Sequence, residues 1–224
     1  MKEKILIIGA HPDDETLGMG GTIAKYTSND NMVHVLIITD GSSSQYGNYE
    51  QMIEKKKNES KEAMRILGVE KIDFNVLPDM KLDTVPHIEI NNLIEEKIRD
   101  FKPSIVYTHH WGDINKDHRL VFESTMVAVR PTINQTVKNI YTYETPSSTE
   151  WNITELNNVF KPNVFVDITK YMEQKLKAVD AYKSELRPYP HPRSVESIKT
   201  QNKGYGISVG TTYAERFYLV RSIQ

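Results

Sequence analysis

Two mostly apolar runs near the start of the chain, separated by one helix-length segment, constrain the fold most strongly. The first run is at residues 5–8 and the second at 33–39. A strand that is apolar along its whole length is buried on both faces, whereas a strand with one exposed face alternates between apolar and polar residues. Strand, helix and strand in this order form a βαβ unit with parallel strands. The opening therefore predicts a doubly wound α/β fold, with helices on both faces of a mostly parallel sheet.

The same alternation of strand and helix patterns continues along the chain. Apolar residues recur at helical spacing within residues 91–101, and Pro103 precedes a β-branched strand pattern at 104–108. Further patterns predict a helix at 50–67, a strand at 72–77, a helix after Asp117, a strand at 164–166 and a helix through Tyr182. A chain of 224 residues can bury a sufficient core without covalent cross-links. We therefore expect a single domain that spans residues 1–224.

Charge and cysteine content exclude several classes of partner and chemistry. The chain has 28 Lys and Arg against 30 Asp and Glu, so it lacks the basic field that favours nucleic-acid binding. There are no cysteines, which excludes disulfides, thiolate metal ligands and a cysteine nucleophile. The apolar run at 5–8 is too short for a signal sequence or a membrane span. We expect a cytoplasmic protein that acts on a small molecule; a homo-oligomer is compatible with the sequence.

The segment His11-Pro12-Asp13-Asp14-Glu15 directly follows the first predicted strand. Ligands of parallel α/β proteins bind beyond the carboxyl ends of the strands, so this loop lies where a site would form. One imidazole and three carboxylates in five residues concentrate negative charge, which requires a cation or helix N-terminal N–H groups. A metal site meets this requirement. A helix cap built from Asp13 and Asp14, with His11 packed in the loop, is an equally good interpretation of this segment alone.

A second polar cluster, residues 109–118, follows the strand predicted at 104–108 and precedes a helix. Two strand-end clusters of one parallel sheet can meet above the same edge. His11, Asp14 and His118 would then supply two nitrogens and one carboxylate, the ligand count of a hydrolytic zinc site whose remaining position holds water. Zn2+ is therefore the expected cofactor, although iron, cobalt or manganese could occupy the same ligands.

The remaining polar residues of the two clusters have predicted catalytic roles. Asp13 cannot easily bind the same ion as its neighbour, so it is free to act as the general base that takes a proton from the activated water. Asp117 is expected to orient an imidazole ligand by hydrogen bonding. His109 or His110, if protonated, would stabilise the oxyanion or protonate the leaving amine. Two strand-end histidines bonded to the backbone are an equally good interpretation of this pair.

These motifs resemble those of a known family. Residues 10–15, the later pair Asp117-His118 and the glycines between them are similar to the PIG-L (LmbE-like) family of N-acetylglucosaminyl deacetylases; the glycines are Gly18, Gly20 and Gly21. Weaker similarity extends through most of the chain, at 67–69, 77–79, 182–184 and 214–217. The resemblance implies a Rossmann-like fold and removal of the acetyl group from an N-acetylated amino sugar or its conjugate. It also implies zinc held by His11, Asp14 and His118, with Asp13 as the base.

The chain departs from the family pattern at Asn115. Many members resemble His-Pro-Asp-His at the position where this chain has Asn115-Lys116-Asp117-His118, so an additional histidine of the family is absent. Two other hypotheses therefore stay open. One is a non-catalytic module that binds a metal and a sugar, and the other is a hydrolase of another amide or acyl group.

Several residues outside the clusters have smaller predicted roles. Trp111 could stack on a sugar ring, but an aromatic residue at a strand end more often packs. The lysines at 55–57 are expected to form a solvated helix face. The resemblance implies a minor alternative for Lys56, contact with the substrate, because the family often has Arg at this position. Arg187, His191 and Arg193 lie in a proline-rich stretch that is predicted to be a long loop. They could reach an anionic substrate, or the prolines could simply fix a surface loop, and they are left outside the catalytic set. The glycines at 18, 20 and 21 oppose a helix and indicate a close backbone approach or a late helix start.

Overall fold

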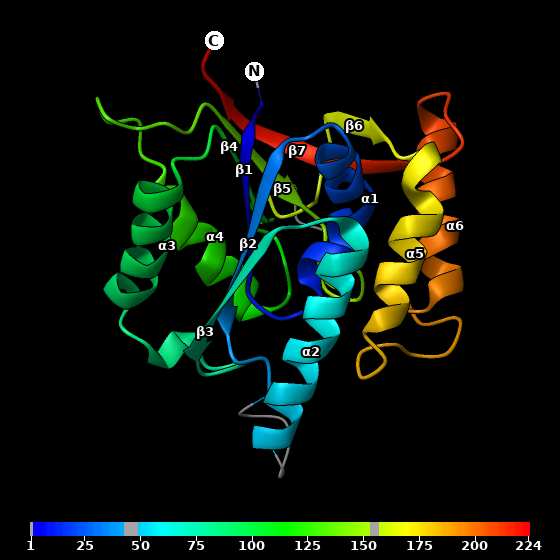
Figure 1. Ribbon diagram of the computed structural model, residues 1–224, viewed down its shortest axis with the longest axis horizontal. Coiled ribbons are helices and arrows are strands. Elements are labelled where there is room, and N and C mark those ends of the chain that lie inside the picture. The colour runs from blue at the N-terminus through cyan, green and yellow to red at the C-terminus, as the bar shows by residue number, and fades with distance from the viewer. Residues whose placement is uncertain (1, 43–48, 153–156) are drawn as a thin grey trace.

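A seven-stranded sheet with the strand order β3-β2-β1-β4-β5-β7-β6 runs through the molecule (Figure 1). The computed structural model describes residues 2–42, 49–152 and 157–224. The strands are β1 Lys4–Gly9, β2 Met32–Thr39, β3 Lys71–Leu77, β4 Ile105–His109, β5 Asn139–Tyr143, β6 Val164–Asp167 and β7 Ala214–Ser222. Strands β1 to β5 pair in parallel, and β7 is antiparallel to both β5 and β6. The predicted mostly parallel α/β sheet is therefore confirmed.

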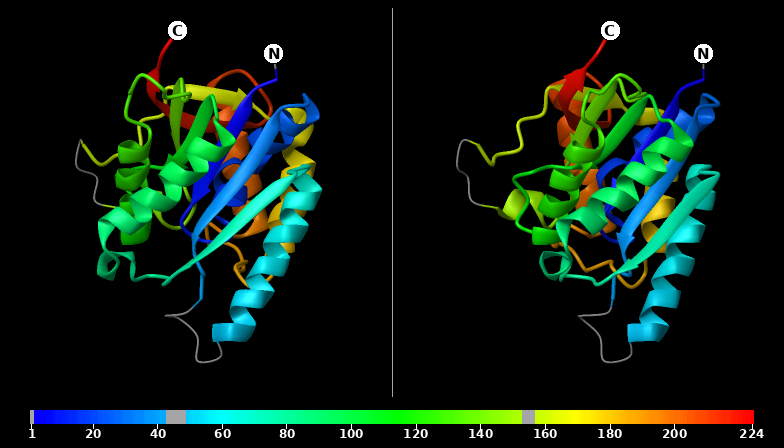
Figure 2. Two further views of the ribbon diagram at one scale, coloured as in Figure 1. Left: turned by 60° about the vertical axis from the view of Figure 1, so that its left-hand side comes forward. Right: turned by 90° about the vertical axis from the view of Figure 1, so that its left-hand side faces the viewer.

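Helices cover both faces of this sheet. They are α1 Asp14–Ser28, α2 Tyr49–Leu67, α3 His87–Phe101, α4 Lys116–Ala128, α5 Met172–Ala181 and α6 Val195–Ser208. In Figure 1, α3 and α4 lie on one side of the sheet and α1, α2 and α5 on the other, with α6 beside α5; the turned views of Figure 2 show the same layers. None of the helices in the described ranges is long and apolar enough to cross a bilayer.

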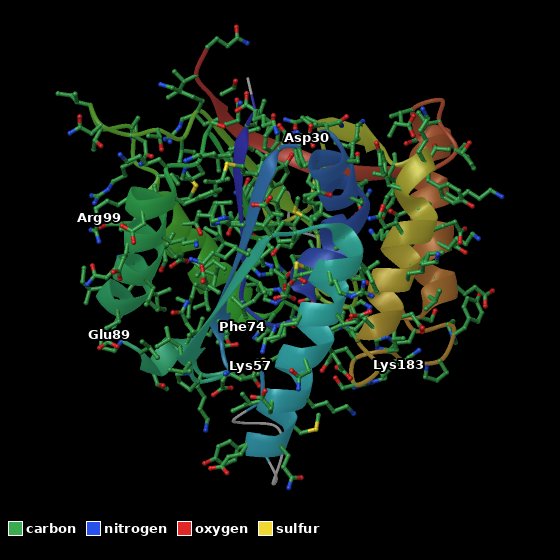
Figure 3. The ribbon with its side chains drawn as sticks, viewed as in Figure 1. Asp30, Lys57, Phe74, Glu89, Arg99 and Lys183 are labelled. Atoms are coloured by element: carbon green, nitrogen blue, oxygen red, sulfur yellow. The ribbon has the colours of Figure 1, made fainter. Side chains whose placement is uncertain are left out.

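Successive residues of β1 point into two separate cores. Ile5 and Ile7 are fully buried in the core that includes residues of α1 and α2, whereas Leu6 and Ile8 are buried with residues of α3 and α4. This two-sided burial explains why the first strand is apolar at every position. The outer faces of the helices remain polar, and Figure 3 shows Glu89 and Arg99 on the side of α3 that faces away from the sheet.

The predicted elements lie within a few residues of the observed ones, but two of the strands and one of the α-helices described above were not predicted. Strand β5 reads Asn-Ile-Tyr-Thr-Tyr, β7 contains charged residues, and α6 contains two glycines. These sequences carry weak periodicity, because polar or flexible residues interrupt the apolar pattern. The interactions with the rest of the sheet, rather than the local pattern, decide their structure.

Helix α1 approaches its neighbours closely at two of the three glycines. A Cβ atom on Gly18 would lie 2.6 Å from the carbonyl oxygen of Glu144, and one on Gly21 would lie 2.7 Å from Cδ1 of Ile168. The helix begins at Asp14 and is kinked at Met19, where the backbone is not helical. The predicted close backbone approach is confirmed at these two positions, and the alternative of a late helix start is wrong.

Candidate metal centre and active site

The two polar clusters meet at the carboxyl ends of β1 and β4. These strands are parallel neighbours in the middle of the sheet, and the chain order changes direction between them: β2 and β3 continue on one side and β5 on the other. Such a switch point leaves a crevice above the strand ends, because the connecting loops diverge to opposite faces. Helices α1 and α4 both begin there, at Asp14 and Lys116.

His11, Asp14 and His118 form one compact group of candidate ligands. Each offers one ligand atom, and these atoms all lie within 4.8 Å of one another. His11 Nδ1 is 3.2 Å from His118 Nε2 and 3.3 Å from Asp14 Oδ2, and His118 Nε2 is 3.3 Å from Asp14 Oδ1. The backbone N–H of His11 donates to Asp14 Oδ2 at 2.7 Å, which fixes the loop that carries both residues.

Two further carboxylates lie beside His11. Asp117 Oδ2 and Asp79 Oδ1 are each 3.3 Å from His11 Nε2. Asp117 also accepts the backbone N–H groups of Met80 and Leu82, at 2.7 and 3.1 Å, so its position is fixed from the β3 side of the site. Asp117 therefore lies where it was expected, next to an imidazole. Asp79 was not predicted, although it follows the end of β3 and the strand-end rule could have indicated it.

Asp113 orients the other imidazole. Its Oδ2 is 3.0 Å from His118 Nδ1, and the same carboxylate accepts hydrogen bonds from the hydroxyls of Ser148 and Thr149. A metal-ligating histidine commonly donates its second ring N–H to a carboxylate, so Asp113 has the geometry of such a partner. This role was not predicted from the sequence, because Asp117 is the direct neighbour of His118 and was the acidic residue expected to orient an imidazole.

The charges of the group fit a divalent cation. Burial lowers the pKa of His11 and His118, but neighbouring carboxylates outweigh it and raise these pKa values to about 10 and about 9. Burial raises the pKa of Asp14, yet His118 and His109 hold it well below its usual range. Asp14 Oδ1 is buried without a hydrogen-bond partner among the described residues. Buried anionic groups of this kind require a positive charge, and two imidazoles with one carboxylate are a ligand set that zinc accepts.

Asp13 lies beside this group in a strained conformation. Its φ is 125°, which L-residues rarely adopt, and it is 2% exposed. Such strain is retained where function requires it and the surrounding structure enforces it. Burial raises the pKa of Asp13 well above its usual value; Arg193 opposes this, while Glu185 adds to it. A carboxylate with a raised pKa is better suited to accept a proton near neutral pH.

Arg193 and Lys56 bring positive charge to the same place. Arg193 Nη1 is 3.1 Å from both Asp13 Oδ2 and Glu185 Oε2, and Lys56 Nζ is 2.8 Å from Glu185 Oε1. Lys56 is only 4% exposed, so the expectation of a solvated helix face is wrong for this residue. The side chain turns inward because a buried carboxylate offers it a charged partner. Neighbouring Lys57 is drawn on α2 in Figure 3.

A polar pocket of about 150 Å³ opens at these residues. Its lining includes His11, Asp13, Lys56, Asp79, Asn115, Glu185 and Arg193. A larger hollow of about 670 Å³ lies near α3 and the end of α4, and its lining contains none of the clustered histidines. The smaller pocket is therefore the one that gives access to His11 of the candidate metal centre and to Asp13.

His109 and His110 do not line this pocket. His109 is fully buried behind the ligands: its Nε2 accepts the backbone N–H of Ala10 at 2.9 Å, and its ring stacks on His118 at 3.9 Å. His110 is also fully buried, and its Nδ1 accepts the N–H of Gly112 at 3.0 Å. Burial lowers the pKa of each to about 4, which favours neutral rings. Their catalytic role stays a prediction.

Trp111 packs against other aromatic residues. Its ring lies 5.5 Å from that of Phe122 and 5.2 Å from that of Tyr218, and its Nε1 donates to the carbonyl oxygen of Asn157. The residue is absent from the lining of the polar pocket. The packing interpretation therefore agrees with the structure better than a sugar-stacking role.

Fold and site together define a Rossmann-like α/β protein with a candidate His-Asp-His metal centre at the strand ends. Comparison with known proteins identifies the family. The chain belongs to the PIG-L family, described as GlcNAc-PI de-N-acetylase, whose model matches residues 6–129. This segment holds both polar clusters, whereas Glu185 and Arg193 lie beyond it. The family predicted from the sequence is thus confirmed.

Several of the similar proteins are deacetylases by name. The chain is 34% identical over 193 residues to an uncharacterized deacetylase of Escherichia coli, covering 82% of this chain and 92% of the relative. It is 31% identical over 232 residues to the diacetylchitobiose deacetylase of Thermococcus kodakarensis, covering 99% and 84%. The solved N,N'-diacetylchitobiose deacetylase of Pyrococcus horikoshii, in complex with an inhibitor, matches with a TM-score of 0.79 and 26% identity, covering 98% and 84%.

Proposed function

We propose that this protein is a metal-dependent hydrolase that removes the N-acetyl group from an N-acetylated amino sugar or its conjugate. The observation that carries the proposal is the placement of Asp13 in the same pocket as His11, beside the group formed with Asp14 and His118. The names of the relatives support the same reaction class, since they include deacetylases of an N-acetylated sugar.

The residues that would hold the metal are His11, Asp14 and His118, and zinc is the ion that this ligand set favours. A divalent metal, when bound, supplies a Lewis acid that polarises the acetamide carbonyl and lowers the pKa of water. Asp117 and Asp113 keep the two imidazoles oriented, because each lies within 3.3 Å of a ring nitrogen of one ligand. Such outer contacts tune the basicity of the ligand rings.

Asp13 acts as the general base in this proposal. Its carboxylate takes a proton from the water that attacks the acetamide carbon, so the water oxygen forms the new C–O bond. The C–N bond then breaks, the leaving nitrogen receives the proton that Asp13 took from the water and departs as the amine, and the acetyl group leaves as acetic acid, which ionises to acetate. Arg193 keeps the Asp13 carboxylate in place throughout, through the contact at 3.1 Å.

The test is acetate release from a panel of N-acetylated amino sugars and their glycosides, using the zinc-loaded protein and its Asp13→Asn variant. We expect the wild type to release acetate and the variant to lose activity by roughly 10²- to 10⁴-fold, with unchanged metal content. A variant that hydrolyses as fast as the wild type would exclude Asp13 as the base.

Differently acylated amines extend the panel. Hydrolysis of another acyl group in preference to acetyl would assign the protein to a different amide substrate. Saturable sugar binding without release of any acid, at full metal occupancy, would instead support a non-catalytic module.

A further inference from the structure

The pocket requires a hydrogen-bond donor for the oxygen that becomes negative during amide hydrolysis. Most polar donors that line it already have strong acceptors. Arg193 donates to the carboxylates of Asp13 and Glu185, and Lys56 is paired with Glu185. The backbone N–H of Met80 donates to Asp117 at 2.7 Å. These groups already donate to acidic residues of the site.

Asn115 differs from these donors because its amide has one end fixed and the other end weakly bound. It is the N-cap residue of α4, and its Oδ1 accepts the backbone N–H of Asp117 at 2.9 Å. Its Nδ2 contacts only the thioether sulfur of Met80, at 3.5 Å, among the described residues. Sulfur of this type is a weak acceptor, so the NH2 group is readily transferred to a better one.

The capping bond also determines where this NH2 group lies. With Oδ1 directed at the start of α4, Nδ2 must be on the opposite side of the planar amide. Asn115 lines the same pocket as His11 and Asp13, and the Asp117 that it caps is 3.3 Å from His11. The weakly bound NH2 group is therefore held at the pocket wall by the capping bond at the start of α4, which limits its movement during a reaction.

We propose that the Asn115 carboxamide donates a hydrogen bond through Nδ2 to the acetamide oxygen as negative charge develops on it. This role rests on the proposed deacetylase function. When the water oxygen bonds to the acetamide carbon, the carbonyl π electrons move to the carbonyl oxygen, and Nδ2–H donates to that oxygen without transferring its proton. When the C–N bond breaks, the carbonyl re-forms and the hydrogen bond weakens. Asn115 is thus a catalytic residue that uses a neutral amide.

Two variants separate this role from capping. Ser and Asp cap helices about as well as Asn, so Asn115→Ser and Asn115→Asp should keep the melting temperature of the wild type. Neither supplies the amide donor. We expect kcat for acetate release to fall by about 10²- to 10³-fold, the usual loss when an oxyanion donor is removed, with KM changed less than about threefold. The serine variant is the neutral control for the negative charge that aspartate adds. Wild-type kcat in Asn115→Ser, or a rise in KM alone, would overturn the proposal.

A binding measurement makes the result independent of turnover. A methylphosphonamidate of glucosamine carries a tetrahedral anionic oxygen in place of the acetamide, and such analogues bind in proportion to transition-state contacts. Calorimetry with the zinc-loaded protein should show weaker binding of this analogue to Asn115→Ser, by about the factor lost in kcat/KM, with unchanged affinity for glucosamine. A wild type that releases no acetate but shows this difference would refute the proposed function, and Asn115 would then be assigned only as a hydrogen-bond donor to a tetrahedral anion in the pocket. Equal affinity of both proteins for the analogue would refute the donor role.

Discussion

Arg193 Nη1 lies 3.1 Å from Asp13 Oδ2, although 180 residues separate them in the chain. The same nitrogen is 3.1 Å from Glu185 Oε2, and Arg193 Nε donates to Ser147 Oγ at 2.8 Å. Arg193 lies just before α6, and its guanidinium therefore connects three other segments. These are the strained loop after β1 with Asp13, the segment after β5 with Ser147, and the segment after α5 with Glu185. Asp13, whose backbone conformation is unfavourable, is thus bonded through its side chain to a residue outside the matched family segment.

The Arg193→Gln variant should be less stable than the wild type. It leaves Asp13 and Glu185 near each other without the shared cation. We expect a loss of about 2 kcal/mol in the free energy of unfolding, less than the ~3–5 kcal/mol for breaking a fully buried pair, because 22% of the Arg193 side chain is exposed. Urea unfolding measures this loss. The control is Arg187→Gln, which removes an exposed arginine that donates to backbone carbonyls, and it should change stability by less than about 0.5 kcal/mol. Equal stability of the two variants would contradict the assigned ion pair.

Zinc binding to the metal-free protein should release protons. The pKa values of His11 and His118 are raised to about 10 and about 9, so both rings carry a proton at pH 7 that a metal must displace. Calorimetry in buffers of different ionisation enthalpy should therefore detect roughly two protons per zinc. Affinity should rise with pH, because proton competition falls as each histidine approaches its pKa. The His191→Gln variant alters a histidine outside the ligand group and should release the same number. Zinc affinity that is constant from pH 6 to 8 would disprove this linkage.

Two glycine substitutions should have opposite effects on stability. In Gly18→Ala the new Cβ would lie 2.6 Å from a backbone oxygen, so α1 must shift and the protein should lose about 1–3 kcal/mol. In Gly204→Ala the new Cβ meets nothing within 4 Å, and an alanine inside an exposed helix should add up to about 1 kcal/mol. Thermal unfolding of the two variants checks both signs. Destabilisation by Gly204→Ala would mean that α6 is more closely packed than the structure shows.

His34 should make the protein sensitive to acid. Burial, together with Lys97 and Lys71, lowers its pKa from 6.5 to about 4, and its ring stacks on Phe101 at 3.8 Å. The folded state therefore takes up this proton less readily than the unfolded state. The neutral His34 ring therefore contributes to the stability of the folded state above pH 6.5, and this contribution is lost as the pH falls through about 4. NMR titration should give a midpoint near 4, and His34→Gln should flatten the dependence of stability on pH in this interval. A midpoint of 6.5 would contradict the expected desolvation.

Local patterns in the sequence were sufficient to locate the candidate metal centre. His11, Asp14 and His118 follow or flank the ends of two strands that could be identified from their apolar runs, and carboxyl ends of neighbouring parallel strands share one edge of a sheet. The adjacent strand ends, together with the first turn of α4 that carries His118, then bring these residues together. The βαβ pattern at the start of the chain likewise determined the parallel sheet, because a strand that is buried on both faces is a nearly continuous run of apolar residues.

Contacts between distant loops were decided only by the tertiary structure. The side chains of Lys56, Glu185 and Arg193 meet at Asp13 because three segments, far apart in the sequence, converge above the sheet. No periodicity encodes such a meeting, since loop paths depend on packing as a whole. The same holds for the burial of His109 and His110 away from the pocket. The sequence determined which residues lie at the strand ends. Tertiary packing decided which of these side chains face the pocket, because the direction and burial of a side chain depend on contacts with residues that are distant in the sequence.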